Sequence, residues 1–217
     1  MMKNTISCLI FDFDGVIADT DRARFYILRD ILKEYSIDFS SHFSMKDLIG
    51  LSTDAFLRKN LKNLTSNQID SIVQKKHRLH FTNLEEYVLP FPGIHETLRD
   101  LHSGFDLVMV SANPYKNLMM LLNHLEIKQY FKWIFGREIC ENDNLEKTYF
   151  PIASKIQKKV SECMVIEDSE YGVNAAKRAG YYCIRFDPHD RFEPGPENDK
   201  AKNHFDLKKK IEKHAMH

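Results

Sequence analysis

Leu9-Ile10-Phe11-Asp12-Phe13-Asp14-Gly15 is an apolar run that delivers two carboxylates, two residues apart, into a glycine turn. The run over residues 6–11 has no helical period and is rich in β-branched and aromatic side chains, which predicts a buried parallel strand. Asp12 and Asp14 then lie at the carboxyl end of that strand, where open α/β sheets bind their ligands. Because two charges at the mouth of an apolar core are costly, the pattern favours a bound cation or a reaction there, although Asp also caps ordinary turns.

A second apolar run ends in small polar residues. Residues 105–110 predict another buried strand, which is followed by Ser111-Ala112-Asn113-Pro114. Asn113 is a good helix cap and Pro114 suits the first helical position, so we expect a helix to begin there. The exposed amides of that helix, together with the Ser111 hydroxyl, would form an anion site.

Two more segments carry chemistry-bearing side chains. Lys147 stands just before a segment with a helical pattern. Further on, residues 163–166 predict a strand that ends in Glu167-Asp168-Ser169, with Ser169 as the cap of the next helix. That helix ends with basic residues followed by Gly180, as helices commonly do.

The alternation of apolar runs and amphipathic stretches predicts a doubly wound α/β core. We expect crossover helices between its parallel strands. The predicted strands are residues 6–11, 107–110, 133–135, 164–166 and 182–185; the predicted crossover helices are residues 95–102, 115–125, 150–159 and 171–179.

Between the first two strands the pattern changes. Apolar residues recur there at helical spacing and no segment resembles a strand, so residues 18–89 predict an all-helical domain, while residues 1–17 and 90–217 form the α/β core. Thr65-Ser66-Asn67 is the expected cap segment before the helix predicted over residues 67–81. The polar tail beyond Pro188 ends in a predicted peripheral helix over residues 206–214, to which we assign no function. The predicted helices of the inserted domain are residues 21–35, 45–49, 55–61 and 67–81.

Composition limits the possible partners. The 217 residues include 31 basic and 31 acidic side chains, so the zero formal charge gives no general attraction to nucleic acid or anionic membranes. No apolar stretch is long enough to span a bilayer, and the first residues lack the pattern of a signal peptide. Three of the four cysteines, Cys8, Cys163 and Cys183, fall in predicted strands. We therefore expect buried, reduced thiols in a cytoplasmic protein whose partner is a small molecule; the sequence does not predict the oligomeric state.

Taken in order, the Asp-x-Asp-Gly motif, the strand-end Ser111, Lys147 before a helix and the strand-end pair Glu167-Asp168 resemble the four motifs of the haloacid dehalogenase superfamily. The resemblance covers about residues 6–188 and is closest to the phosphatase and β-phosphoglucomutase-like branch. It implies a Rossmann-like parallel sheet with a helical cap inserted between the first and second motifs. It also implies phosphoryl transfer to water or to a sugar.

The resemblance assigns a catalytic role to each motif. Asp12 would be the nucleophile that forms an aspartyl-phosphate, and Asp14 would protonate the leaving oxygen and then deprotonate the attacking water. Positive charge and donors around the phosphate are needed as well. The groups that would bind the phosphate are Ser111, Ala112, Asn113 and Lys147, with Ser111 and Lys147 also counted as catalytic.

The acidic side chains at this site would repel one another and a bound phosphate unless a hard cation were present, and Mg²⁺ fits an all-oxygen site best. These side chains are Asp12, Asp14, Glu167 and Asp168. The implied ligands are the carboxylates of Asp12 and Asp168, the backbone carbonyl of Asp14, and Glu167 either directly or through water. Thr20 would support Asp14 in the substrate site. Arg24 in the cap is a candidate for binding a substrate carboxylate or a second phosphate.

Departures from the family pattern discriminate between its branches. The usual Pro directly after the motif lysine is replaced by Thr148. The β-phosphoglucomutase branch carries a His and a Lys-Gly-x-x-Arg cap loop, where this chain has Arg24, Ile49 and Thr53. Dehalogenases and phosphonoacetaldehyde hydrolases lack the second aspartate, which is present here as Asp14. We therefore expect a Mg²⁺-dependent phosphatase acting on a phosphoglycolate or sugar-phosphate type of metabolite. A sugar-phosphate mutase and a non-catalytic phosphate-binding relative remain the alternatives.

Overall fold

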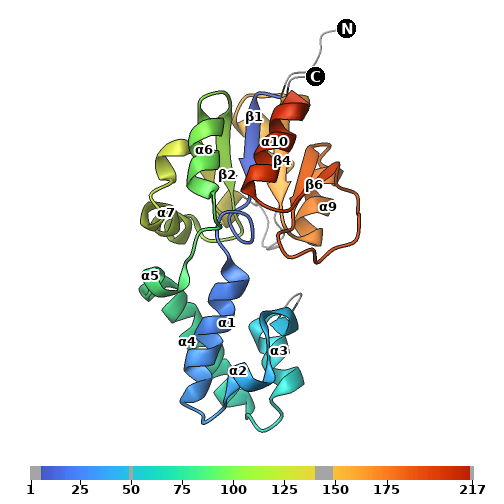
Figure 1. Ribbon diagram of the computed structural model, residues 1–217. Helices are drawn as coiled ribbons and strands as arrows, with labels where there is room; N and C mark the ends of the chain where they lie inside the picture. The colour runs from blue at the N-terminus through green and yellow to red at the C-terminus, as the bar shows by residue number, and fades with distance from the viewer. Residues whose placement is uncertain (1–5, 49–50, 140–148, 216–217) are drawn as a thin grey trace. The chain divides into compact units, whose positions relative to one another are not determined.

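The computed structural model describes residues 6–48, 51–139 and 149–215 (Figure 1). The chain divides into two compact units, Met1–Ala18 with Pro90–His217 and Asp19–Leu89. The first boundary lies one residue after the position expected from the sequence, and the second coincides with it. Each unit is described separately below.

The first unit is built on a parallel sheet whose strands follow the order β3-β2-β1-β4-β5-β6. The predicted parallel α/β fold is confirmed. The edge strand β6 was not predicted, because its three residues, Asp-Lys-Ala, form no apolar run. The strands are β1 (Cys8–Phe11), β2 (Asp106–Val110), β3 (Trp133–Phe135), β4 (Cys163–Glu167), β5 (Tyr182–Phe186) and β6 (Asp199–Ala201).

Helices cover both faces of this sheet. Alternate strand residues such as Cys8, Ile10 and Val165 pack with buried side chains of α8 and α9 on one face. On the other face, Phe186 contacts the ring of His204 at the start of α10, and α10 packs against α6; Figure 1 shows these two helices in front of the sheet. The helices are α6 (Ile94–His102), α7 (Tyr115–His124), α8 (Ile152–Lys155), α9 (Glu170–Arg178) and α10 (His204–Ala215), with short 3₁₀ turns η2 (Lys128–Tyr130), η3 (Arg137–Ile139) and η4 (Val160–Glu162).

Two local predictions in this unit are wrong. The helix expected over residues 150–159 is only the four-residue α8, because Gln157 has a left-handed φ of 56° that redirects the chain toward β4. The second concerns α7, whose cap is Pro114 and not Asn113. Pro114 has an extended ψ of 140°, so the helix begins one residue later than expected.

The sheet brings the ends of its central strands to one edge. Phe11 is in register with Ile166 on β4 and with Met109 on β2. The amide of Asp12 continues the ladder by donating to the Ile166 carbonyl at 3.0 Å. Residues that follow β1, β2 and β4 therefore share the carboxyl edge, at the point where the strand order reverses on either side of β1.

The second unit contains helices and no strand among its described residues. Its core is a separate apolar cluster, in which α1 residues such as Ile27 and Ile31 pack against Phe39 and Phe56. Thr65 caps α4 in a capping box with Gln68, which confirms the predicted cap. The elements are α1 (Thr20–Lys33), α2 (Phe39–His42), η1 (Met45–Leu48), α3 (Thr53–Asn60), α4 (Ser66–Thr82) and α5 (Leu84–Tyr87).

Candidate active site

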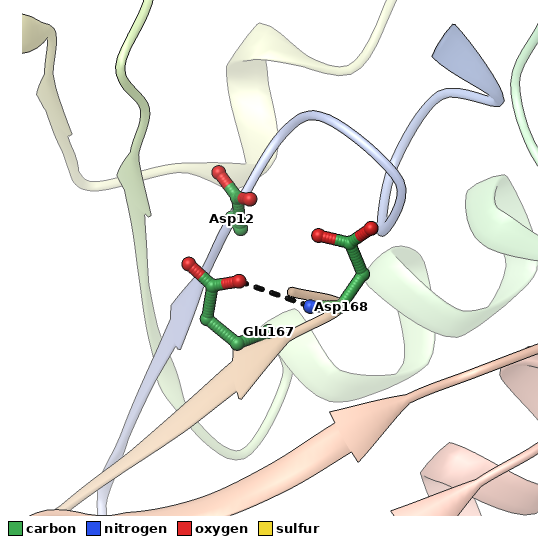
Figure 2. Close-up of side chains that lie close together, drawn as sticks. All are labelled: Asp12, Glu167 and Asp168. Atoms are coloured by element: carbon green, nitrogen blue, oxygen red, sulfur yellow. Dashed lines mark hydrogen bonds between the residues drawn. The ribbon is translucent and has the colours of Figure 1, made fainter. Parts of the chain in front are cut away.

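Three carboxylates converge at the carboxyl edge of the central strands (Figure 2). Asp12, Glu167 and Asp168 each offer one oxygen, and these oxygens all lie within 4.8 Å of one another. Asp12 is 5% exposed and Glu167 is fully buried. Because a buried group of like charges is costly without a counter-charge, and because the donor set is all oxygen, the cluster fits a hard divalent cation such as Mg²⁺.

Glu167 is fixed by donors on both of its oxygens. The Tyr149 hydroxyl donates to Oε1 at 2.9 Å. The Ser169 hydroxyl and the amides of Asp168 and Ser169 donate to Oε2 at 3.0–3.3 Å. Donors of this kind favour the ionised carboxylate. Burial, followed by the neighbouring Glu167 charge, raises the pKa of Tyr149 well above its usual value, so its hydroxyl stays protonated as a donor.

A basic side chain contacts Asp168. Nη2 of Arg191 lies 3.0 Å from Oδ2 of Asp168. Arg191 also contacts Asp187, whose carboxylate follows β5 and is fully buried. Burial alone would raise the pKa of Asp187, but hydrogen bonds from the Arg191 amide and Lys200 ammonium, among others, hold it below its usual value. A positive charge is thus held beside the acidic cluster by a second, ionised carboxylate.

The second motif contacts Asp14. Nδ2 of Asn113 donates to Oδ2 of Asp14 at 2.7 Å and to the Ser111 hydroxyl at 3.1 Å. The amide of Asn113 also donates to that hydroxyl, which is nearly buried. The amide of Tyr115 at the start of α7 donates to the Glu138 carboxylate. The first amide of α7 is therefore occupied by an acidic side chain of the same unit, which the prediction of an anion site at this helix did not anticipate.

The remaining predicted site residues are placed differently. Lys147 lies outside the described residues. Ala112 follows Ser111 in the loop after β2, and Thr20 is the first residue of α1 in the other unit. The Arg24 guanidinium donates to the carbonyls of Leu48 and Leu51 at 2.6 Å and to Asp21 at 2.9 Å. Burial lowers the pKa of Arg24. These contacts give Arg24 a structural role in the helical unit.

Three residues next to the cluster were not singled out from the sequence. They are Tyr149, Asp187 and Arg191, and none belongs to a motif by residue type. Two weak signals were available: Tyr149 stands two residues after Lys147, and Asp187 and Arg191 are an acid and a base four residues apart directly after a strand. Neither signal identifies the partner, because Glu167 at the end of β4 and Asp168 directly after it are both distant in sequence from the residues that contact them.

The comparisons with known proteins agree with this geometry. A 24% identical relative over 81% of this chain and 67% of its own length is the phosphoglycolate phosphatase of Pseudomonas fluorescens Pf-5. The phosphorylated carbohydrates phosphatase of Thermotoga maritima is 25% identical, with coverage of 81% and 82%. Fructose-1-phosphate phosphatase YqaB of Escherichia coli is 23% identical, with coverage of 79% and 92%. None of the helices in the described part of the chain is both long and apolar enough to cross a membrane.

Solved structures share the fold. A HAD family hydrolase from Deinococcus radiodurans R1, determined with bound phosphate and sodium, superimposes with a TM-score of 0.79 at 17% identity, over 98% of each chain. A HAD-superfamily hydrolase from Geobacter sulfurreducens gives a TM-score of 0.76 at 16% identity, over 95% of this chain and 96% of the other. The model of the haloacid dehalogenase-like hydrolase family matches residues 9–186. The chain therefore belongs to the haloacid dehalogenase-like hydrolase family.

Proposed function

We propose that this protein, a phosphatase of the haloacid dehalogenase-like family, hydrolyses a small phosphorylated metabolite through an aspartyl-phosphate on Asp12, with Mg²⁺ as cofactor. The observation that carries the proposal is the convergence of Asp12, Glu167 and Asp168 within 4.8 Å at the carboxyl edge of the sheet. The names of the relatives, which are phosphatases of phosphoglycolate and of phosphorylated carbohydrates, support this substrate class.

Each step has a residue of this chain to perform it. A carboxylate oxygen of Asp12 attacks phosphorus while the bond from phosphorus to the leaving oxygen breaks, and Asp14 gives that oxygen its proton. Water then attacks the phosphorus, returns a proton to Asp14 and releases inorganic phosphate from Asp12. The contact from Asn113 to Asp14 holds the proton-transfer group in one orientation during both steps.

Two further groups complete the proposed site. Asp12 and Asp168, with Glu167 beside them, would hold Mg²⁺, which would supply positive charge against the phosphate oxygens. Lys147 is the proposed second source of positive charge, and Ser111 with neighbouring amides is the proposed phosphate cradle. Arg24 is left out of the substrate site because its guanidinium contacts carbonyls in its own unit.

The test is phosphate release over a panel of phosphoglycolate, sugar phosphates, nucleotides and 4-nitrophenyl phosphate, with Mg²⁺ or with EDTA. We expect Mg²⁺-dependent release that Asp12→Asn lowers by at least about 10³-fold, because that change removes the nucleophile. The matched control is Asp106→Asn, which alters a carboxylate at the amino end of β2, paired with Lys132 and Lys158.

Each other outcome has a distinct meaning. Phosphate release that continues in EDTA, or in the Asp12→Asn variant, contradicts the proposed chemistry. Interconversion of isomeric sugar phosphates without net release would instead support the mutase alternative. Phosphate binding without turnover on any substrate would support a non-catalytic relative.

A further inference from the structure

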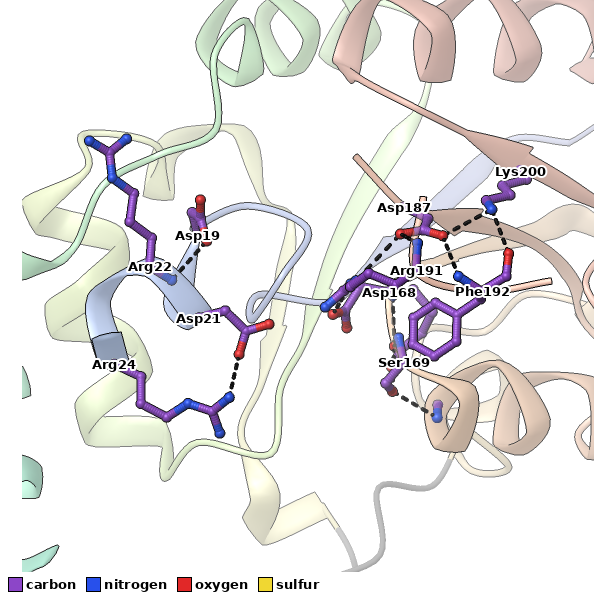
Figure 3. A network of polar contacts seen from close by, with 12 residues as sticks. Asp19, Asp21, Arg22, Arg24, Asp168, Ser169, Asp187, Arg191, Phe192 and Lys200 are labelled. Carbon is purple, nitrogen blue, oxygen red and sulfur yellow. Dashed lines mark hydrogen bonds and ion pairs between the residues drawn. The ribbon is translucent and has the colours of Figure 1, made fainter. Parts of the chain in front are cut away.

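The contact between Arg191 and Asp168 is more than a loose surface ion pair. The two side chains are 9% and 15% exposed, and the Arg191 Nη2 to Asp168 Oδ2 distance is 3.0 Å (Figure 3). Exposed pairs contribute little because water screens them and because two long side chains must be ordered. Here both side chains are largely shielded from water, so the contact constrains where the Asp168 carboxylate points.

Arg191 is itself held in place by Asp187. Its Nε and its backbone amide both contact Oδ1 of Asp187, at 3.3 and 3.0 Å. The next amide, that of Phe192, donates to the other oxygen of Asp187 at 3.0 Å. Figure 3 shows the resulting line of contacts from Asp187 through Arg191 to Asp168. The guanidinium is therefore ordered before any ligand binds, and it costs little further entropy to hold Asp168.

The same oxygen of Asp168 is enclosed from the other side. A Cβ atom built on Gly15 would lie 2.1 Å from Oδ2, so that oxygen rests directly against the backbone of the loop after β1. Figure 2 shows one oxygen of Asp168 on the side of Asp12 and Glu167 and the other on the far side. Oδ2 of Asp168 therefore contacts both the Arg191 guanidinium and the Gly15 backbone. These two contacts block rotation of the Asp168 carboxylate.

The neighbouring carboxylates have a similar arrangement. Oδ1 of Asp12 accepts the Phe13 amide at 2.6 Å. Oε2 of Glu167 accepts three donors. In each of the three carboxylates at least one oxygen is bound by a protein donor, and the donor to Asp168 is the side chain of Arg191, which lies outside the sequence motifs.

We propose that Arg191 is a positioning residue that restricts Asp168 to one metal-ligating oxygen and so makes the site prefer Mg²⁺ over Ca²⁺. The inference rests on the proposed function in that it takes this cluster as the cation site. Mg²⁺ requires six oxygens in octahedral geometry at about 2.0–2.1 Å, whereas Ca²⁺ takes six to eight and often binds a carboxylate through both oxygens. Two-oxygen binding by Asp168 would require Oδ2 to leave Arg191.

The experiment measures cation binding directly. Mg²⁺ and Ca²⁺ are titrated separately into the full-length protein by calorimetry, for the wild type, Arg191→Met and Arg191→Lys. Loss of the positive charge strengthens the binding of both cations, and this effect cancels in the ratio of their dissociation constants. We expect Arg191→Met to shift that ratio toward Ca²⁺ by about tenfold, the lower end of what outer ligands contribute at metal sites. Arg191→Lys keeps the charge but not the two-point contact, so its ratio should lie in between.

Lys200→Met is the matched control. Lys200 pairs with Asp187 and Asp190 and donates to the Phe192 carbonyl, so its loss loosens the same loop without removing the contact to Asp168. We expect its Mg²⁺ to Ca²⁺ ratio to equal that of the wild type. Thermal unfolding of each variant measures how far the loop contributes to stability alone.

A ratio within twofold of the wild type in folded Arg191→Met overturns the inference. An equal shift in Lys200→Met does so too, because the effect would then belong to the loop. If Arg191→Met does not fold, an unchanged ratio in Arg191→Lys decides against the inference in the same way. These failures leave Mg²⁺-dependent phosphate release intact, whereas a wild-type protein that binds neither cation contradicts the cofactor of the proposed function.

Discussion

A fully buried carboxylate such as Glu167 is tolerated only when its charge is met by donors, a counter-ion or both. Its Oε2 takes three donors from the chain that follows β4, which are local in sequence. Its Oε1 depends on Tyr149, eighteen residues earlier. The hydroxyl of Tyr149 thus couples the segment after Lys147 to the acidic pair, and it is the contact that a single substitution can remove without changing the motif.

We expect Tyr149→Phe to weaken Mg²⁺ binding by about tenfold, because outer partners of metal ligands typically contribute at least that much. The loss of one buried hydrogen bond should also lower the free energy of unfolding by about 1–2 kcal/mol. Calorimetric titration and urea denaturation measure the two effects. Tyr182→Phe is the control, since it removes a hydroxyl contact to His214 far from the cluster. Unchanged Mg²⁺ affinity in Tyr149→Phe would show that Oε1 needs no hydroxyl donor.

At the scale of the element, α9 depends on a glycine to approach the end of β4. A Cβ atom on Gly172 would lie 2.0 Å from Oε1 of Glu167, which real structures do not permit. The helix begins at this point because the Ser169 hydroxyl accepts the Gly172 amide at 3.0 Å. The contacts among Ser169, Gly172 and Glu167 therefore determine how closely α9 approaches the site.

We expect Gly172→Ala to lower both stability and phosphate release, because either α9 or Glu167 must shift to admit the methyl group. The loss of unfolding free energy should be about 1–3 kcal/mol, the usual cost of overpacking. Gly104→Ala is the matched control, since no atom lies within 4 Å of its added Cβ. Urea denaturation and the phosphate assay on both variants give the comparison. A Gly172→Ala protein as stable and active as Gly104→Ala would contradict the packing argument.

The elements also show why sequence patterns predicted this fold well and its details less well. Five strands were predicted because buried parallel strands are continuous apolar runs, and such runs depend only on local sequence. The edge strand β6 was not predicted, because an edge strand need not be apolar. The helix containing α8 was predicted too long, because the left-handed conformation of Gln157 has no signal in its residue type. The contacts of Asn113 with Asp14 and of Arg191 with Asp168 join residues far apart in sequence, so only the assembled sheet reveals them.

At the scale of the whole molecule, the C-terminal segment is tied back to the loop after β1. Nε2 of His204, at the start of α10, donates to the Val16 carbonyl at 2.9 Å, across 188 residues of sequence. His204 is 1% exposed and packs against the rings of Phe91 and Phe186. Burial lowers the pKa of His204 to about 4 from 6.5. The sequence assigned no role to this tail, because a single histidine in a polar segment predicts no partner.

This pKa gives stability a defined pH dependence. Since the folded state disfavours the protonated ring, the unfolded state binds more protons between pH 6.5 and 4, and stability falls as the pH falls through that window. At pH 5 the wild type should have lost about 2 kcal/mol relative to pH 7 through His204 alone. Urea denaturation of the wild type and His204→Gln at both pH values isolates this contribution, because other titrating groups cancel. A stability difference between the two proteins that does not change with pH would contradict it.

The two units should also be separable, because the chain leaves and re-enters the α/β unit at one place. Ala18 and Pro90 form an antiparallel bridge, and the Phe91 amide donates to the Ile17 carbonyl at 3.0 Å. A turn of two or three glycines can therefore replace Asp19–Leu89 without moving the strands. Each unit has its own apolar cluster, so the shortened protein should retain a complete sheet core.

We expect this shortened protein to unfold in one cooperative transition and to bind Mg²⁺ within about threefold of the full chain, since Asp12, Glu167 and Asp168 all belong to the α/β unit. Circular dichroism during urea denaturation and calorimetric titration measure the two properties. A version carrying Asp12→Asn is the control for binding at the cluster. Non-cooperative unfolding would show that the sheet needs the helical unit to fold. Cooperative unfolding without Mg²⁺ binding would show that the helical unit, although it supplies none of the three clustered carboxylates, is required to form the cation site.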